Sequence, residues 1–406
     1  MKRVGLCLCF CSIFSLFAEV VLAQSMRNYI KSAESVIFPV EEPVNRLQSP
    51  YIEIFACKEK GNVFDIVSID TSGISMLTYD LSTKQFSSYT LTKKYKKNNQ
   101  SINAICADDR YLIIGSSWLN SRLQIYTRAD LNSQFVLSRV LELPKQIGYV
   151  RQIFLMPNDK VLVCSWYLCS YCDKNDFIKV ALIDLKTDNV DFVKSLSISY
   201  QGLTYFTPLR MFEVSGNSIF FSELGSYKIY EYDIDFNLKD SISPDCYSKI
   251  WKPYPQKKMN KILSNYQDPS SRIWYLGNYT QYSRMNNIYA ISEKELSVSY
   301  FLSGNDMFTD IWRKENGSWK LYRKALADVS LNNSDRYNRL YTIGWTNLLN
   351  GFDAKHGKIY RLDYRLPLDL KSMEQMTDEE VEKFNADYLS EHEKVLVLDL
   401  WDYNFD

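Results

Sequence analysis

The stretch MFEVSGNSIFFSELGSYKIYEYDIDFNLKDSISP, residues 211–244, contains four short apolar segments separated by polar turns. The first two segments flank the turn SGNS, and the third, IYEYD, ends at Asp233. A fourth apolar segment follows this aspartate turn. Apolar segments of this length, bounded by glycine, serine, asparagine and aspartate, are typical of β-strands. The stretch therefore predicts a unit of four consecutive strands.

The same order of segments recurs six times, and two separate positions count the repeat. The polar turn between the first two strands recurs at Gly61, Asp109, Asp159, Gly216, Ser270 and Gly357. The end of the third strand recurs at Asp80, Thr127, Asp184, Asp233, Ser292 and Asp399. Both positions give a repeat of about 50 residues, with a longer last step.

Six four-stranded units predict an all-β fold, a six-bladed β-propeller, because small sheets bury both faces only by packing on their neighbours around a ring. The last unit lacks a fourth strand, and the lone segment SVIFPV at 35–40 is expected to supply it and close the ring. A set of unrelated sheets, or two sandwiches, is the alternative. The expected blades are 51–93, 101–143, 147–198, 204–243, 259–303 and 339–406.

A lone N-terminal strand, third strands of the YDL type and a last unit reading GKIYRLDYRLP and VLVLDLWDYNFD together carry a resemblance. The chain resembles exported six-bladed propeller proteins of TolB-like architecture that gut bacteria carry, mostly without known function. The resemblance covers nearly the whole mature chain, although Thr127 and Ser292 replace the repeated aspartate. It implies the architecture and an exported location, and no catalytic residues.

Residues 1–23 are expected to form an export signal, because Lys2 and Arg3 precede an apolar run and small residues stand before a cleavage site after Ala23. An uncleaved membrane anchor is the alternative, but Glu19 interrupts the run, which falls short of the roughly 20 apolar residues of a spanning helix. We therefore expect a mature chain, 24–406, that is periplasmic, extracellular or at the cell surface and does not insert in the membrane.

The overall charge is balanced, with 48 basic and 48 acidic residues, so no global field favours nucleic acid or an anionic membrane. His356 and His392 are the two histidines, which leaves few candidates for a histidine base or metal ligand. No nucleotide-binding, serine-hydrolase, zinc-protease or EF-hand motif is present. We expect no cofactor and no metal, and a monomer.

Four long loops are expected on one face of the disc, at 168–176, 244–259, 304–338 and 367–394, whereas the turns between first and second strands are tight. Long loops on a rigid scaffold commonly carry binding sites. These loops hold the aromatic and basic candidates for ligand binding Trp251, Tyr254, Trp312, Arg313, Trp319 and Tyr322. The alternative is that these side chains pack the insertions onto the disc.

The sequence TDEE at 377–380 is a capping box, which predicts a helix from Thr377 to about residue 393 within blade six. An apolar stripe on this helix is expected to dock it on the propeller, and a partner-binding helix is the alternative.

Six cysteines follow the export signal, and three of them, Cys164, Cys169 and Cys172, have the C-x4-C-x2-C spacing that opens a plant-type iron–sulfur ligand set. The repeat places Cys169 and Cys172 in a hairpin loop of blade three, far in sequence from Cys246. A disulfide is favoured, either Cys169–Cys172 or one of these with Cys164 or Cys246; free buried thiols are the alternative.

Two classes of function stay open. A non-catalytic module that binds a protein or glycan through the loop-bearing face is favoured by the aromatic loops and the scarcity of histidine. A carboxylate-dependent hydrolase or lyase, acting on a carbohydrate or small ester in the channel, is the alternative. Acids such as Glu223 and Asp310 cannot be paired from sequence, so no catalytic residue is assigned.

Overall fold

The structure is a computed structural model of the chain. It describes residues 29–37, 51–56, 63–69, 74–92, 100–118, 121–147, 149–166, 178–196, 210–223, 225–253, 281–303, 307–327, 351–353, 357–365, 377, 379–380 and 395–406. The expected export signal, Tyr254, Cys169 and Cys172 lie outside these residues. No helix in the described segments is long and apolar enough to cross a bilayer.

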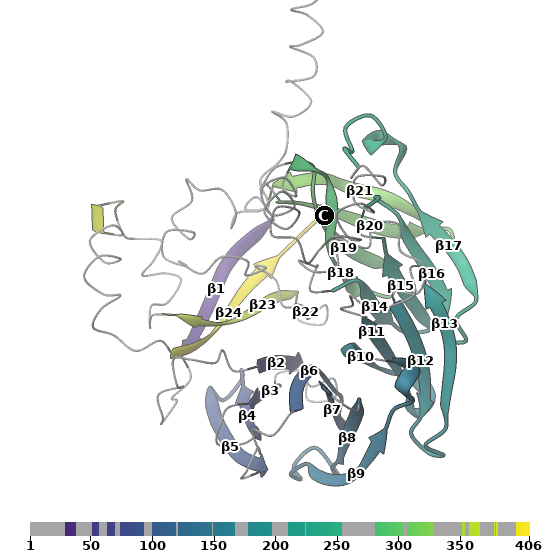
Figure 1. Ribbon diagram of the computed structural model, residues 1–406. Helices are drawn as coiled ribbons and strands as arrows, with labels where there is room; N and C mark the ends of the chain where they lie inside the picture. Colours follow the sequence, from purple (N-terminus) through teal and green to yellow (C-terminus); the bar gives the residue numbers. More distant parts are fainter. Residues whose placement is uncertain are drawn as a thin grey trace, which may run out of the picture.

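Six four-stranded antiparallel sheets form a ring of blades, which confirms the predicted β-propeller (Figure 1). Blade one contains β2 (Tyr51–Ala56), β3 (Val63–Ile69), β4 (Ile74–Asp80) and β5 (Gln85–Thr92). Blade two contains β6 (Gln100–Ala107), β7 (Tyr111–Trp118), β8 (Arg122–Thr127) and β9 (Val136–Glu142). Blade three contains β10 (Tyr149–Met156), β11 (Lys160–Trp166), β12 (Ile178–Asp184) and β13 (Val190–Leu196).

The second half of the ring follows the same order. Blade four contains β14 (Phe212–Ser215), β15 (Ser218–Ser222), β16 (Ile229–Asp233) and β17 (Leu238–Ile242). Blade five contains β18 (Arg284–Ser292), β19 (Glu295–Phe301), β20 (Met307–Glu315) and β21 (Ser318–Ala327). Blade six contains β22 (Gly351–Asp353), β23 (Lys358–Arg365), β24 (Val395–Tyr403) and β1 (Ile30–Ile37).

The hydrophobic core lies between the blades rather than within any one of them. On β16, Ile229 packs against blade five, and Tyr232, on the opposite face of the strand, packs against blade three. Side chains that alternate along a strand point to opposite faces of its sheet, so each blade is apolar on both faces. A single blade could not bury these surfaces, which is why the repeat requires a ring.

Strand β1 closes the ring by pairing with β24, as the lone N-terminal segment predicts. In Figure 1 the purple β1 lies beside the yellow β24, although they come from opposite ends of the chain. Ser35 donates a hydrogen bond of 2.7 Å to Asp399, which is fully buried. The first strands of successive blades also contact one another around the centre, and β2 of blade one contacts β23 of blade six.

The repeated aspartate at the end of the third strand caps the following turn. Asp80, Asp184 and Asp233 each accept hydrogen bonds from backbone N–H groups two to four residues ahead. In blade two the same role belongs to Asp130, which accepts from the N–H groups of Asn132 and Ser133. An aspartate side chain that binds backbone N–H groups ahead of it stabilises a turn, which explains why Thr127 can replace the aspartate there.

The predicted strand positions in blade five are wrong. The predicted loop 304–338 contains β20 and β21, and Ser292 ends the first strand of the blade instead of the third. Asn316 and Gly317 form the β20–β21 turn with positive φ angles of 50° and 84°. An Asn-Gly pair between apolar segments is a strong hairpin signal because both residues tolerate positive φ. The sequence SEKE at 292–295 resembles the aspartate turn that follows the third strand in other blades. The repeat therefore placed the third strand before this turn and missed the β20–β21 hairpin.

The two faces of the disc differ. The turns between first and second strands and between third and fourth strands are at one face, which we call the turn rim. Residues 167–177, 254–280, 328–350 and 366–394 separate strand ends at the opposite face, which we call the loop rim. The loop rim thus matches the expected face, but the predicted loop 304–338 is not part of it.

At the capping box, Thr377 and Glu380 exchange the expected hydrogen bonds, of 2.7 and 3.2 Å. The rest of the predicted helix lies outside the described residues.

Candidate functional site

The described aromatic candidates from the sequence gather on blade five and its junctions with blades four and six. Trp312 is 5% exposed and packs in the core between blades four and five, together with the half-buried Trp251 and Trp319. Tyr322 packs in the core between blades five and six. The prediction of an exposed ledge is therefore wrong for Trp312, because its strand turns the indole toward the neighbouring blade. Packing onto the disc was the alternative reading.

A buried carboxylate lies at the centre of the blade four–five junction. Asp310, on β20, is fully buried and accepts hydrogen bonds from the hydroxyls of Tyr227, Tyr247 and Tyr300 at 2.7, 2.8 and 2.9 Å. The backbone N–H of Ala325 donates a fourth, of 2.7 Å. We call these five residues the Asp310 cluster. It lies near the loop rim, because Tyr227 comes just before β16, and Tyr300 and Ala325 stand near the ends of β19 and β21 that lie there.

A β-bulge holds the fourth donor in place. The pairing of β20 with β21 shifts between Thr309 and Ile311, so Lys324 and Ala325 together oppose Asp310. Ala325 has a φ of 51°, a left-handed conformation that costs energy for any residue with a Cβ. This conformation points its N–H group at the Asp310 carboxylate. The resulting hydrogen bond offsets part of the conformational cost.

The Asp310 cluster is closed and fully hydrogen-bonded. Burial raises the pKa of Asp310, and the N–H of Ala325 and the three hydroxyls act in the opposite direction. Burial also raises the pKa of Tyr227 and Tyr300 well above the ordinary tyrosine value, so the hydroxyls remain donors. The indole N–H of Trp312 donates to Tyr227 at 2.9 Å. Both oxygens of Asp310 accept hydrogen bonds, so this carboxylate links residues from both sides of the blade four–five junction.

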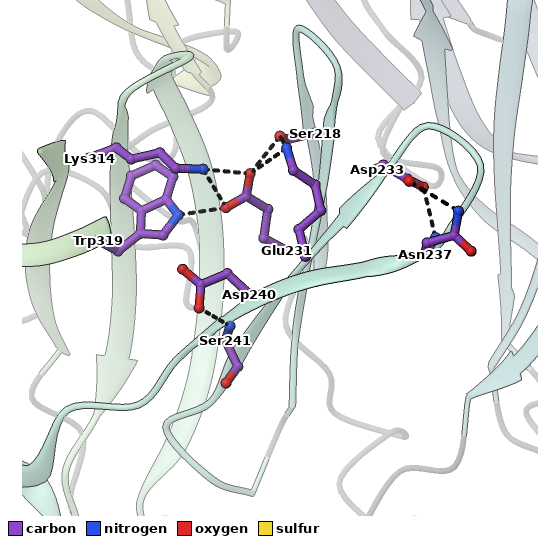
Figure 2. Close-up of polar contacts among 9 residues, drawn as sticks. Ser218, Glu231, Asp233, Asn237, Asp240, Ser241, Lys314 and Trp319 are labelled. Carbon is purple, nitrogen blue, oxygen red and sulfur yellow. Dashed lines mark hydrogen bonds and ion pairs between the residues drawn. The ribbon is translucent and has the colours of Figure 1, made fainter. Parts of the chain in front are cut away.

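A second buried carboxylate, Glu231 on β16, ties the same two blades together nearer the turn rim (Figure 2). Lys314 and the indole N–H of Trp319 reach it from blade five, with distances of 2.8 Å to Oε2. Ser218 and Lys239 of blade four donate to Oε1 at 2.7 and 3.1 Å. Burial alone raises the pKa of Glu231, but these donors outweigh it and lower the pKa to about 2. The carboxylate therefore stays ionised at neutral pH.

Arg313 and Tyr322, the remaining described candidates, connect blade five to blade six. The Arg313 guanidinium donates to Glu295 and pairs with Asp406, both at 2.7 Å, and its carbon lies 3.6 Å from the centre of the Tyr322 ring. A planar guanidinium can stack on an aromatic ring while it donates in its own plane to carboxylates. Arg313 thus joins β20 to the C-terminal residues.

Ion pairs of this kind recur at the turn rim. They join blades six and one (Lys84–Glu34, 3.3 Å), two and three (Arg139–Asp188, 2.8 Å) and three and four (Lys160–Asp235, 3.4 Å). A buried pair, Arg128–Asp65 at 3.3 Å, joins blades one and two. The turn rim therefore combines short connections with direct ties between neighbouring blades.

Trp251 belongs to a link that is pinned at the loop rim. The link leaves β17, forms a short 3-10 turn, η5 (Asp245–Tyr247), and inserts Tyr247 into the Asp310 cluster. The indole N–H of Trp251 donates to the carbonyl of Gly225 at 2.8 Å. Tyr254 follows outside the described residues. Trp251 thus anchors the beginning of the link on blade four.

The described cysteines of the predicted disulfide set are free thiols. Cys164, on β11, is fully buried in an apolar core, and burial raises the pKa of its thiol well above the ordinary value. Cys246 is exposed in η5 and is also free. A bridge from either residue is therefore not formed, and the Cys169–Cys172 pairing stays a prediction. In the described part of the chain, no group of histidine, cysteine, aspartate and glutamate side chains could hold a metal ion.

The sequence reasoning did not identify the roles of Glu231 and Asp310. Glu231 lies two residues before the repeated aspartate, on the strand face that points at blade five, so alternation could have marked it as buried. Asp310 lay in a segment interpreted as a loop. The Asn316-Gly317 turn could have corrected that interpretation.

Comparison with one solved structure supports the fold. No protein-family model and no curated protein matches the chain. A solved structure from Bacteroides fragilis, described as an exported protein, is similar with a TM-score of 0.52 at 12% identity, over 92% of this chain and 95% of that one. A luciferin-regenerating enzyme has a TM-score of 0.39 at 8% identity, over 87% and 95% of the two chains. The β-propeller domain of the Trilobed protease from Pyrococcus furiosus has a TM-score of 0.35 at 9% identity, over 68% and 86%.

Proposed function

We propose that the chain is an exported, non-catalytic propeller that binds a protein or glycan partner through its loop rim. The observation that carries this proposal is the asymmetry of the disc. The segments 167–177, 254–280, 328–350 and 366–394 all depart from strand ends at one face. Rigid scaffolds commonly present their binding residues on such segments, while the scaffold itself supplies only the geometry.

The sequences of these segments suit molecular recognition. Residues 254–280 and 328–350 include Tyr254, Trp274, Tyr341 and Trp345. Tyrosine and tryptophan supply large contact areas at a low entropic cost, and their ring faces also stack on sugars. The opposite rim offers short turns, and some of their charged side chains, such as Lys84, Asp188 and Asp235, take part in ties between blades.

The surroundings of Asp310 and Glu223 favour a scaffold over a hydrolase. Asp310 is enclosed by its four donors, and Glu223 accepts a hydrogen bond of 2.6 Å from Tyr230 and another from Ser226. A pair of carboxylates that hydrolyses a glycoside must face the substrate and leave room for it. Asp310 does not meet this requirement, and the half-buried Glu223 is engaged by two hydroxyl donors, so the loop rim is the better candidate for function.

Export is part of the proposal. The expected signal at 1–23 and the fold shared with a Bacteroides fragilis protein described as exported support it. Detection of a mature N-terminus at Gln24 in the periplasm or culture medium would test it, and retention of the full-length chain in the cytoplasm would contradict it.

The binding proposal can be tested with the mature chain, residues 24–406. Glycan arrays and capture of secreted proteins would identify ligands, followed by titrations with the variants Tyr254→Ala and Trp345→Ala. We expect at least one variant to weaken binding by about tenfold or more, the loss typical of an anchor residue. Phe86→Ala, on the outer strand β5, is the control and should bind as the wild type does. Unchanged binding in both variants, or turnover of a captured glycan, would contradict the proposal.

A further inference from the structure

A strong local charge stands out against the neutral chain at the start of the link between blades four and five. Residues 249–261, KIWKPYPQKKMNK, contain five lysines and no acidic residue, whereas the whole chain has 48 basic and 48 acidic residues. The charge is interleaved with the aromatic residues Trp251 and Tyr254. Such a run is often only a solvated loop. The structure of its described part, residues 249–253, therefore decides whether it can contribute to a binding site.

The described part of this link has a fixed backbone. Tyr247 is buried in the Asp310 cluster and Trp251 is tied to Gly225. Lys252 and Ser283 are joined twice, by Lys252 N–H to Ser283 Oγ at 2.9 Å and by Ser283 N–H to the Lys252 carbonyl at 2.8 Å. Lys249 and Lys252 are therefore displayed from a segment anchored to both blades, which lowers the entropic cost of binding.

A third lysine joins them from blade five. Lys324 is exposed in the β-bulge beside Ala325, and its Nζ lies 5.5 Å from the centre of the Tyr247 ring. Lys252 Nζ lies 5.3 Å from the centre of the Tyr282 ring. We call Lys249, Lys252 and Lys324 the lysine surface. It lies at the loop rim, above the Asp310 cluster.

Among the described residues, no carboxylate lies within ion-pair distance of these three lysines, although Asp245 is exposed at the start of η5. At the turn rim, by contrast, three exposed lysines are paired: Lys84 with Glu34, Lys186 with Asp159 and Lys320 with Glu315. Three exposed lysines at the loop rim that have no carboxylate partner among the described residues favour an anionic ligand.

We propose that the lysine surface binds an anionic polysaccharide, with its lysines on successive carboxylate or sulfate groups and the neighbouring ring of Tyr282 on a sugar ring. This inference rests on the proposed function of the loop rim. Protein interfaces are enriched in arginine and depleted in lysine, and residues 249–261 contain no arginine, which argues against an acidic protein as the ligand. The half-buried ring of Tyr282 beside Lys252 places an apolar face next to a positive charge, which suits the alternating apolar faces and charged groups of a polysaccharide.

The test measures binding of the mature chain to immobilised polygalacturonate, dextran sulfate, uncharged dextran and poly-glutamate at physiological salt. We expect binding to one or both anionic polysaccharides; the carboxylate and sulfate probes distinguish which group is recognised. Binding should fall steeply as salt rises, because exposed charges are screened within about 8 Å at 0.15 M ionic strength. The triple variant Lys249→Gln, Lys252→Gln, Lys324→Gln should bind about tenfold more weakly or worse.

The matched control is the triple variant Lys84→Gln, Lys186→Gln, Lys320→Gln, which removes the same charge from the turn rim. It should bind as the wild type does, and both triple variants should keep a near wild-type unfolding midpoint. Equal losses in both variants, equal binding to poly-glutamate, or no binding to either anionic polysaccharide would overturn the inference. Tyr254→Ala or Trp345→Ala could weaken binding of a captured ligand while the Lys249, Lys252 and Lys324 triple variant binds it normally. In that case the inference fails and the proposed function stands.

Discussion

At the scale of single residues, the junction of blades four and five depends on two buried acids that are stabilised in different ways. Glu231 is surrounded by two lysines and an indole N–H, so its charge is compensated. Asp310 has hydroxyl and backbone donors instead, and burial raises its pKa. The two acids should therefore respond differently to substitution and to pH.

Glu231→Gln should lower the free energy of unfolding by about 3 kcal/mol at pH 7, because Lys314 and Lys239 lose their buried partner. Urea unfolding measures this change. Glu315→Gln is the control, because it removes an exposed pair with Lys320 and should cost less than about 1 kcal/mol. Equal effects of the two substitutions would contradict a compensated buried charge at Glu231.

The Glu231 contribution should also depend on pH. The pKa of Glu231 in the folded chain, about 2, is below the ordinary value of 4.5. A group whose pKa is lowered by folding stabilises the protein above its unfolded pKa, and this stability is lost as the pH falls through the folded value. The stability difference between wild type and Glu231→Gln should therefore shrink as the pH falls from 5 towards 2. A difference that stays constant over this range would argue against the ion pairs.

Tyr247→Phe should lower the free energy of unfolding by about 1 kcal/mol, because it removes one donor to Asp310. Asp310→Asn should cost about 1 to 3 kcal/mol, since an amide cannot accept from all four donors. Tyr322→Phe is the control, because among the described residues its hydroxyl has one long contact, of 3.4 Å, with Arg323. If Asp310→Asn is as stable as the wild type, the cluster does not hold the junction.

At the scale of secondary-structure elements, the closing strand β1 offers a comparison within one strand. Val36 is 7% exposed and faces the core between blades six and one, whereas its neighbour Ile37 is 40% exposed. Val36→Asp should lower the free energy of unfolding by about 3 kcal/mol or more, because it buries an unpaired charge. Ile37→Asp should have a small effect. Thermal unfolding of the two variants tests both, and similar losses would place β1 in a different register.

The elements also show where sequence reasoning succeeded. Polar turns such as Gly216 and capping aspartates such as Asp233 recur because each blade needs the same turn chemistry, and this local requirement is visible in one sequence. Blade five departs from the pattern, because the hairpin β20–β21 uses Asn316 and Gly317 in place of an aspartate turn. The repeat count was right, but the strands of that blade could not be placed from the aspartate alone.

At the scale of the whole molecule, closure by β1 should make unfolding cooperative. Intrinsic tryptophan fluorescence and far-ultraviolet circular dichroism should report one coincident urea transition for the mature chain. Deletion of residues 24–38 removes β1 and leaves β24 paired with β23 on one side only, so it should lower the transition midpoint and separate the two signals. Two separate transitions in the undeleted chain, or an unchanged midpoint after deletion, would contradict a ring held closed by β1.

The sequence by itself determined the fold class, the number of blades, the closing strand and the face that carries the long segments. These features follow from local rules, since apolar alternation and turn chemistry are set by residues near one another in the chain. Only the tertiary structure decided that Trp312 and Trp319 are packed between blades, that Asp310 is enclosed by three tyrosines, and that Lys249, Lys252 and Lys324 share one surface. Such contacts join residues from different blades, and their partners are chosen by the packing of the ring rather than by any local pattern.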